Sequence, residues 1–209
     1  MIGRRRDKGE DAGSVESPSP EVEDAVSLSS RDRGPWDEAE APEDETRMDM
    51  GSIRVRGVDG LQMQVQMDER TGAVSMITLG LGDASVQVQA FAAPRSAGIW
   101  PEIRAQIASS ITSSGGLAEE VAGEFGGELS AQVPGPGGAL QPARFVGVDG
   151  PRWFLRGLFL GSAAPQGGSA ELEAVFRDLV VVRGTEAMAP GEPLPLTLPS
   201  GAQATKVEG

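Results

Sequence analysis

The side chains that could do chemistry in this chain are arginines, carboxylates and tryptophans, because most other catalytic residue types are missing. The 209 residues include no His, Cys, Tyr or Asn, and the only lysines are Lys8 and Lys206. A folded part without these residues has no Ser–His or Cys–His nucleophile. It also has no lysine for a Schiff base or a phosphate loop, and no His or Cys ligand for zinc. We therefore expect a protein that is not an enzyme and that needs no cofactor.

Arginines around the most apolar stretch of the chain form the first candidate binding site. Arg152 and Arg156 flank Trp153, and Arg104 lies in a segment with helical periodicity. Guanidinium groups bind phosphate and carboxylate through paired hydrogen bonds, so a cluster of them would hold an anion or a nucleotide. The more common arrangement is that such arginines pair with nearby acids, such as Asp149, at the ends of strands and helices.

Tryptophans form the second set of candidates. Trp100 and Trp153 could stack on a ligand, although a tryptophan on an apolar helix face or in a core strand usually packs inside the protein. Trp36 lies in an acidic stretch, where we expect it to dock either on the chain's own domain or on a partner.

Paired carboxylates are the weakest candidates. Glu119-Glu120 and the pair Glu171 and Glu173 come closest to an acid/base arrangement, but neighbouring glutamates rarely point the same way and are usually solvated. No spacing typical of metal ligands occurs. A carboxylate-only hydrolase that needs a divalent cation is therefore a third alternative.

Composition divides the chain into three parts. Residues 1–50 hold 15 acidic and 7 basic residues and little apolar surface, which predicts a disordered acidic arm. Residues 51–199 predict a single domain, and residues 200–209 a mobile tail. The arm and tail leave about 140–150 residues, enough to fold without a metal or a disulfide.

Charge and the absence of long apolar runs indicate the compartment. A net charge of −13 would repel nucleic acid and anionic membranes. No apolar run follows the basic start Arg4-Arg5-Arg6, and none is long enough to span a bilayer. We expect a soluble cytoplasmic protein that contacts neither nucleic acid nor membrane.

Apolar periodicity predicts about eight strands and two amphipathic helices. Residues 61–67 alternate strictly between apolar residues and glutamines, as in a half-buried strand. Segments 100–111 and 172–179 repeat apolar residues every three to four positions, and Ser169 is a suitable N-cap for the second. Consecutive hairpins with helices packed on them make a mostly antiparallel α+β fold.

The stretch 147–157 is where we expect the core to form. Asp149-Gly150 predicts a tight turn with positive φ, and residues 153–160 predict a central strand. The motif Gly-Val-Asp-Gly at 147–150 also occurs at 57–60, which indicates either an internal duplication or two similar turns.

Longer motifs extend over nearly the whole chain, at residues 3–6, 34–37, 87–94, 98–100, 147–157 and 176–184. In these motifs the chain resembles the actinobacterial family catalogued as domain of unknown function 3710. The resemblance implies a cytoplasmic actinobacterial protein and supplies no catalytic residues. In pattern only, the late strand followed by a helix and an extended segment is similar to the Mog1/PsbP-type sandwich.

These observations predict a protein-interaction module. The α+β domain would bind a protein partner, with the acidic arm, Trp36 and the Arg4-Arg5-Arg6 cluster as further contacts. The alternative is a domain that binds a small molecule, a nucleotide or another anion through Arg152 and Arg156. The oligomeric state stays open.

Overall fold

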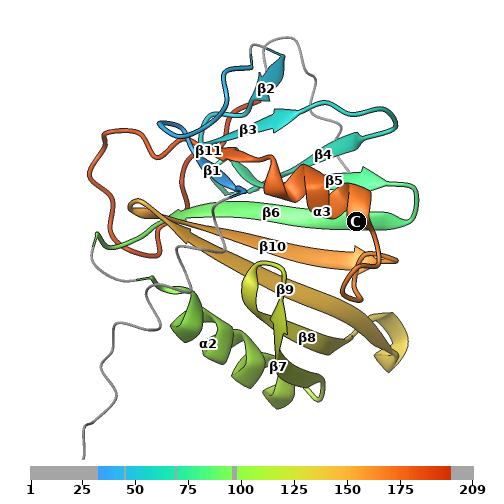
Figure 1. Cartoon of the computed structure of the whole chain (residues 1–209). Helices are drawn as coiled ribbons and strands as arrows, with labels where there is room; N and C mark the ends of the chain where they lie inside the picture. Colours follow the sequence, from blue (N-terminus) through green and yellow to red (C-terminus); the bar gives the residue numbers. More distant parts are fainter. Residues whose placement is uncertain (1–32, 45, 69, 96–97, 199–209) are drawn as a thin grey trace, which may run out of the picture.

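The computed structural model describes residues 33–44, 46–68, 70–95 and 98–198, which form eleven strands and two α-helices (Figure 1). The helices are α2 (Trp100–Ser113) and α3 (Ala170–Arg177), and a short 3-10 helix, η1 (Pro136–Gly138), precedes β9. The strands are β1 (Trp36–Asp37), β2 (Arg47–Asp49), β3 (Ile53–Arg56), β4 (Gln62–Met67), β5 (Val74–Leu81), β6 (Ala84–Ala92), β7 (Leu117–Gly123), β8 (Gly126–Pro134), β9 (Leu140–Gly150), β10 (Trp153–Gly161) and β11 (Val180–Val181).

The strands form two sheets. A large antiparallel sheet has the order β4-β5-β6-β10-β9-β8-β7. A small sheet has the order β1-β11-β3-β2, in which β1 and β11 are parallel. The predicted α+β class and the two helices are confirmed. The small sheet was not predicted, and it accounts for the larger number of strands.

The main core lies between the large sheet and α3. β6 alternates between buried and half-exposed residues along its length, so one of its faces is apolar and the other carries glutamines. From α3, Leu172 and Phe176 are fully buried in this core, and the Phe176 ring meets Phe159 of β10 edge-on at 5.4 Å. The side chain of Ser169 accepts the Leu172 N–H (3.3 Å), so the predicted N-cap is confirmed.

A smaller apolar cluster lies where α2 packs on β7, β8 and β9 (Figure 1). Ile111 of α2 meets Leu129 and Ala131 of β8, with Ile107 and Phe145 at the edge of the cluster. The helical periodicity of residues 100–111 is explained by this contact. Neither of the described helices is long and apolar enough to cross a membrane.

The turn between β9 and β10 lies two residues later than predicted. Gly150 still belongs to β9 and pairs with Trp153, so the turn is Pro151-Arg152, and Arg152 has a φ of 63°. Proline followed by a residue with positive φ is the geometry of a type II turn. Gly150 is needed for a different reason, because a Cβ there would lie 2.1 Å from the Trp153 ring.

The two Gly-Val-Asp-Gly motifs have different structures. Residues 57–60 form an exposed turn between β3 and β4, where the Leu61 N–H donates to the Val58 carbonyl (3.1 Å). Residues 147–150 lie inside β9 instead, and a Cβ on Gly147 would meet the Trp100 ring at 2.2 Å. This difference gives no support to an internal duplication.

The folded domain begins before residue 50, contrary to the predicted arm of residues 1–50. β1 and β2 belong to the small sheet, and Met50 is fully buried. The rest of the predicted arm, residues 1–32, and the predicted tail, residues 200–209, lie outside the described residues. Before that tail, Leu194 and Leu196 are buried in the main core, so this segment belongs to the folded domain.

Candidate functional site

The face of the large sheet opposite the main core is only partly covered. α2 packs on β7, β8 and β9. Apart from Phe154, which is fully buried, the side chains of β6 and β10 that point to this face stay half exposed. Arg156 of β10 lies on this face and is in register with Gln89 of β6. We call the side chains of Gln89, Phe91, Arg156 and Leu158 the open face.

A row of stacked aromatic rings joins α2 to the open face. Trp100 stacks on Phe154 with ring centroids 5.7 Å apart, and Phe154 stacks on Phe91 at 6.0 Å. A guanidinium lies at each end, Arg104 at 5.8 Å from the Trp100 ring and Arg156 at 5.3 Å from the Phe91 ring. Such cation–ring contacts are attractive. Three of the predicted residues, Trp100, Arg104 and Arg156, therefore belong to one continuous row.

The two arginines of this row have different partners. Arg104 Nη2 donates to Glu120 Oε2 at 2.8 Å. Arg156 Nη2 donates to the side-chain oxygen of Gln89, whose Nε2 donates to the Ser75 carbonyl (2.9 Å). Among the described residues no carboxylate pairs with Arg156, and burial lowers the pKa of its guanidinium. Because arginine stays charged at neutral pH, Arg156 is a half-buried cation whose contacts among the described residues are a neutral amide and the Phe91 ring.

Arg152 does not join Arg156 in a common anion pocket. It lies at the β9–β10 turn, roughly 13 Å along the strand from Arg156 at 3.3 Å per residue. Its Nη2 donates to the Gly184 carbonyl (3.2 Å), and its own carbonyl accepts from Arg183 Nε (3.0 Å). Arg152 therefore fixes the turn against the segment that follows β11.

The remaining two predicted residues hold β1 onto the domain. Trp153 is fully buried on the core side of β10, and its Nε1 donates to Asp37 Oδ2 (2.7 Å). Trp36 lies in β1, and its backbone N–H donates to the Leu179 carbonyl (2.8 Å). Of the two docking sites expected for Trp36, the structure shows the one on the chain's own domain.

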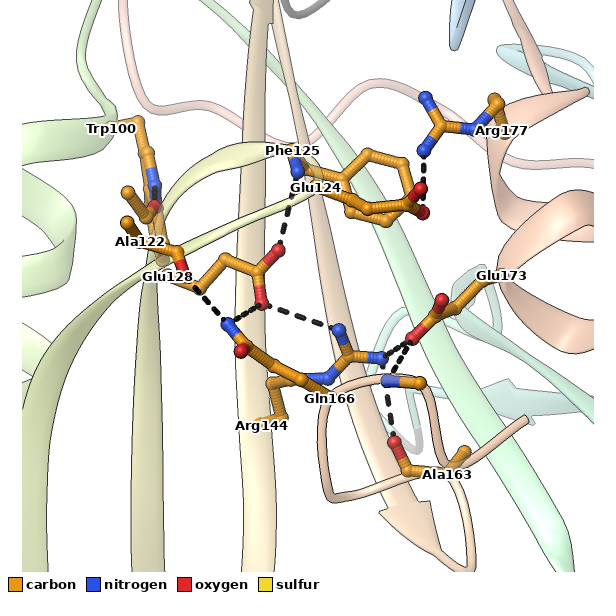
Figure 2. Close-up of polar contacts among 12 residues, drawn as sticks. Trp100, Ala122, Glu124, Phe125, Glu128, Arg144, Ala163, Gln166, Glu173 and Arg177 are labelled. Atoms are coloured by element: carbon orange, nitrogen blue, oxygen red, sulfur yellow. Dashed lines mark hydrogen bonds and ion pairs between the residues drawn. The ribbon is translucent and has the colours of Figure 1, made fainter. Parts of the chain in front are cut away.

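Sequence analysis missed a buried ion cluster, which Figure 2 shows. Arg144 of β9 is 2% exposed and lies between Glu128 of β8 and Glu173 of α3. Its Nη1 donates to Glu128 Oε2 (3.2 Å), and its Nη2 donates to Glu173 Oε1. The guanidinium also lies 4.5 Å from the centre of the Phe159 ring. This cluster links two strands of the large sheet to α3.

Neighbouring groups complete the hydrogen bonding of Glu128 but not of Glu173. The Phe125 N–H donates to Glu128 Oε1 (3.2 Å), and Gln166 Nε2 donates to Glu128 Oε2 (3.4 Å). The Gly167 N–H donates to Glu173 Oε1 (3.2 Å), whereas no described residue donates to Glu173 Oε2. Two carboxylates and one guanidinium leave the cluster with one net negative charge.

Two cavities flank α3 and share Ala174 of that helix and Asp178, the residue that follows it. The first has a volume of about 630 Å³ and the second about 440 Å³. Residues that line the first include Arg33, Trp36, Glu124, Gly167, Glu173 and Arg177. Residues that line the second include Arg56, Val58, Asp59, Leu81, Glu171 and Val175.

Clusters of acidic side chains bear on the third alternative, the carboxylate-only hydrolase. Nowhere among residues 33–198, apart from the few left undescribed, do three or more acidic side chains gather so that they could hold a metal ion.

Comparison with known protein families agrees with the motifs read from the sequence. The family described as protein of unknown function (DUF3710) matches residues 34–205. No curated protein and no solved structure matches the chain, so the likeness to the Mog1/PsbP-type sandwich stays a prediction. Since the match begins at β1 and includes every described element, the chain belongs to the DUF3710 family.

Proposed function

We propose that this protein is a binding module that recognises an acidic segment of a partner protein through its open face. The observation that carries the proposal is the Arg156 guanidinium, which is half buried on a central strand without a carboxylate partner among the described residues. A partner's aspartate or glutamate would supply the missing anion through charge-assisted hydrogen bonds.

The surroundings of Arg156 suit a protein partner. Phe91 and Leu158 lie half exposed beside it on the same face. Binding energy at protein interfaces concentrates in arginines and aromatic residues that are surrounded by other contacts. The guanidinium is also held in place by Gln89 and by the Phe91 ring, which reduces the entropy lost on binding.

The residue types on this face favour binding over catalysis. The chain contains no His or Cys, and the open face consists of an amide, an aromatic ring, a guanidinium and an aliphatic side chain. None of these groups acts as a general base at neutral pH.

A crosslinking pull-down from the source cells tests the proposal. We would compare the full-length parent protein with Arg156→Gln and with Arg70→Gln, in which an exposed arginine of the β4–β5 turn loses the same charge. We expect the parent and Arg70→Gln to recover the same partner. Recovery by Arg156→Gln should fall about tenfold or more, because a lost hydrogen bond to a charged group costs about 1.5–3 kcal/mol.

Two results would overturn the proposal. One is a parent protein that recovers no partner above background. The other is an Arg156→Gln variant that recovers as much partner as Arg70→Gln while both variants melt at the same temperature as the parent.

Binding of a small anion or a nucleotide is the second candidate, since the same unpaired guanidinium would accept a phosphate. Thermal unfolding with inorganic phosphate and with ATP separates the two functions. A ligand at 100 times its Kd stabilises the folded state by ~2.7 kcal/mol. Stabilisation that disappears in Arg156→Gln would favour the anion.

A further inference from the structure

The first cavity beside α3 lies between the N-terminal segment of the domain and the helix. Arg33 and Trp36 line it from the N-terminal side, Glu173 and Arg177 from α3, and Glu124 from the β7–β8 turn. Its volume of about 630 Å³ falls inside the range of roughly 300–1,000 Å³ that is usual for small-molecule sites.

Most charges in the lining are already neutralised. Arg177 Nη2 pairs with Glu124 Oε2 at 2.8 Å. Asp178 is contacted by Arg47 (2.8 Å) and Arg56 (3.1 Å). These groups therefore leave little charge for a ligand to neutralise.

Two buried or half-buried groups of this lining keep an atom without a described hydrogen-bond partner, Arg177 at Nη1 and Glu173 at Oε2. The Arg177 charge is already paired with Glu124, so Glu173 is the group considered next. Its side chain is 9% exposed, and its Oε1 is engaged by Arg144 and the Gly167 N–H. Its Oε2 accepts no hydrogen bond from the described residues. Figure 2 shows this second oxygen turned away from Arg144, on the side of Glu124 and Arg177, which line the same cavity. This oxygen is open to the cavity and not sealed inside the protein, so a ligand there can donate a hydrogen bond to it in place of water.

We propose that this cavity binds a small zwitterion of the amino-acid class, whose ammonium group donates to Glu173 Oε2. A cationic donor fits because the cluster of Glu128, Arg144 and Glu173 has one net negative charge, which a neutral donor would not balance. Trp36 also lines the cavity, and an indole ring attracts an ammonium group. Arg33, for which the described residues provide no carboxylate, binds the carboxylate of the same ligand.

A metal ion fits this cavity less well than an organic cation. Among the lining carboxylates, Glu173 and Glu124 each keep one oxygen without a described hydrogen-bond partner, and Glu124 is already paired with Arg177 through its other oxygen. No three acidic side chains of the described chain gather into a metal site. The free Glu173 oxygen satisfies an ammonium group, whereas these two oxygens fall short of the roughly six or more oxygen ligands of Mg²⁺ or Ca²⁺.

A titration of the isotope-labelled full-length protein tests this inference. The probes are ω-amino acids of increasing length, from glycine through γ-aminobutyrate to ε-aminocaproate, and the amide signals of Gly167 and Ala170 report on binding. We expect saturable shifts that are strongest for the length that spans from Glu173 to Arg33. n-Butylamine, which lacks the carboxylate, should bind more weakly than γ-aminobutyrate.

Three variants locate the site. Glu173→Gln removes the uncompensated charge but leaves Arg144 paired with Glu128, so it should fold and bind about tenfold or more weakly. Glu171→Gln is the matched control, because this exposed carboxylate of α3 lines the other cavity. Ala170→Leu fills the first cavity from an exposed position and should abolish the shifts.

The inference is overturned by any of three outcomes. No probe produces a saturable shift, binding survives Ala170→Leu, or Glu173→Gln binds as tightly as Glu171→Gln. Arg156→Gln, on the opposite face of the large sheet, should leave this binding unchanged. The zwitterion site and the open face can therefore fail independently.

Discussion

Arg144 lies almost fully buried between Glu128 and Glu173, so each of these carboxylates depends on its guanidinium. Replacing it by methionine would leave two buried carboxylates without a cation. Removing one member of a buried ion pair typically costs about 3–5 kcal/mol. We expect Arg144→Met to lower the free energy of unfolding by about this amount, measured by urea denaturation.

An exposed ion pair provides the matched control for Arg144. Arg54 Nη2 lies 2.6 Å from Glu38 Oε1, and the two side chains are 34% and 46% exposed, respectively. Arg54→Met should cost less than about 1 kcal/mol, as is usual for exposed pairs. Adding Glu128→Gln and Glu173→Gln to Arg144→Met should restore part of the lost stability. A loss no larger than that of Arg54→Met would contradict the importance of the cluster.

At the residue scale, the sequence indicated the kind of interaction but not the partners. The arginines near the core were expected to pair with nearby acids. Arg104 pairs with Glu120, 16 residues away, and Arg177 with Glu124, 53 residues away. Asp149, the nearby acid suggested for Arg152, contacts the start of α2 instead. Which acid meets which arginine depends on strand register and helix position, and neither can be read from local spacing.

The N-terminus of helix α2 is capped by a side chain from the neighbouring sheet. It has no side-chain cap of its own, and Asp149 of β9 accepts hydrogen bonds from the Ile99 N–H (2.9 Å) and the Trp100 N–H (3.3 Å). The free N–H groups of a helix start favour an anion there. Burial nevertheless raises the pKa of Asp149 above its ordinary value of 3.8, although the two hydrogen bonds oppose this shift.

The raised pKa of Asp149 predicts how stability depends on pH. The folded state holds the proton more tightly than the unfolded state, so the contribution of Asp149 is complete below pH 3.8 and declines as pH rises through the raised folded pKa. Asparagine does not titrate. We therefore expect the free energy of unfolding of the parent, relative to Asp149→Asn, to fall as pH rises above 3.8 in urea denaturation at a series of pH values.

Asp68 provides a control of opposite sign. Hydrogen bonds from the backbone and side chain of Thr71 lower its pKa, so its contribution is present above pH 3.8 and lost as pH falls through the lowered value. The parent should therefore gain stability relative to Asp68→Asn as pH rises towards 3.8. An Asp149 curve that is flat, or that rises with pH, would be at odds with the burial of that carboxyl.

At the element scale, the sequence predicts those helices and strands whose period and cap lie within one short segment. The period of α3 and its cap Ser169 lie within one short segment, and the alternation of β4 and β6 can be read directly from the sequence. The start of α2 could not be predicted in the same way, because its capping carboxylate is 50 residues away from Ile99. The β9–β10 turn was misplaced because Asp149-Gly150 is a good local turn pair whose residues are required by tertiary contacts instead.

At the scale of the whole molecule, composition misassigned the first strands of the domain. β1 and β2 have two and three residues, too few to produce a periodic pattern inside an acidic stretch. These two strands are held in place by contacts between residues that are far apart in the sequence. Trp153 contacts Asp37, 116 residues away, and Arg47 contacts Asp178, 131 residues away. An average over 50 residues cannot detect individual contacts of this kind.

The corrected boundary predicts that a chain starting at Arg33 is more stable than one starting at Gly51. The shorter chain lacks β1, β2 and the fully buried Met50, and it lacks Arg47, which is 3% exposed and pairs with Asp178. Loss of one buried methionine side chain costs about 1.5–3 kcal/mol. We expect a Tm at least about 5 °C lower for the shorter chain, and Met50→Ala in the longer chain should reproduce part of this drop. If both chains unfold at the same temperature, residues 33–50 contribute nothing to the domain, and the boundary at residue 50 that composition predicts is right after all.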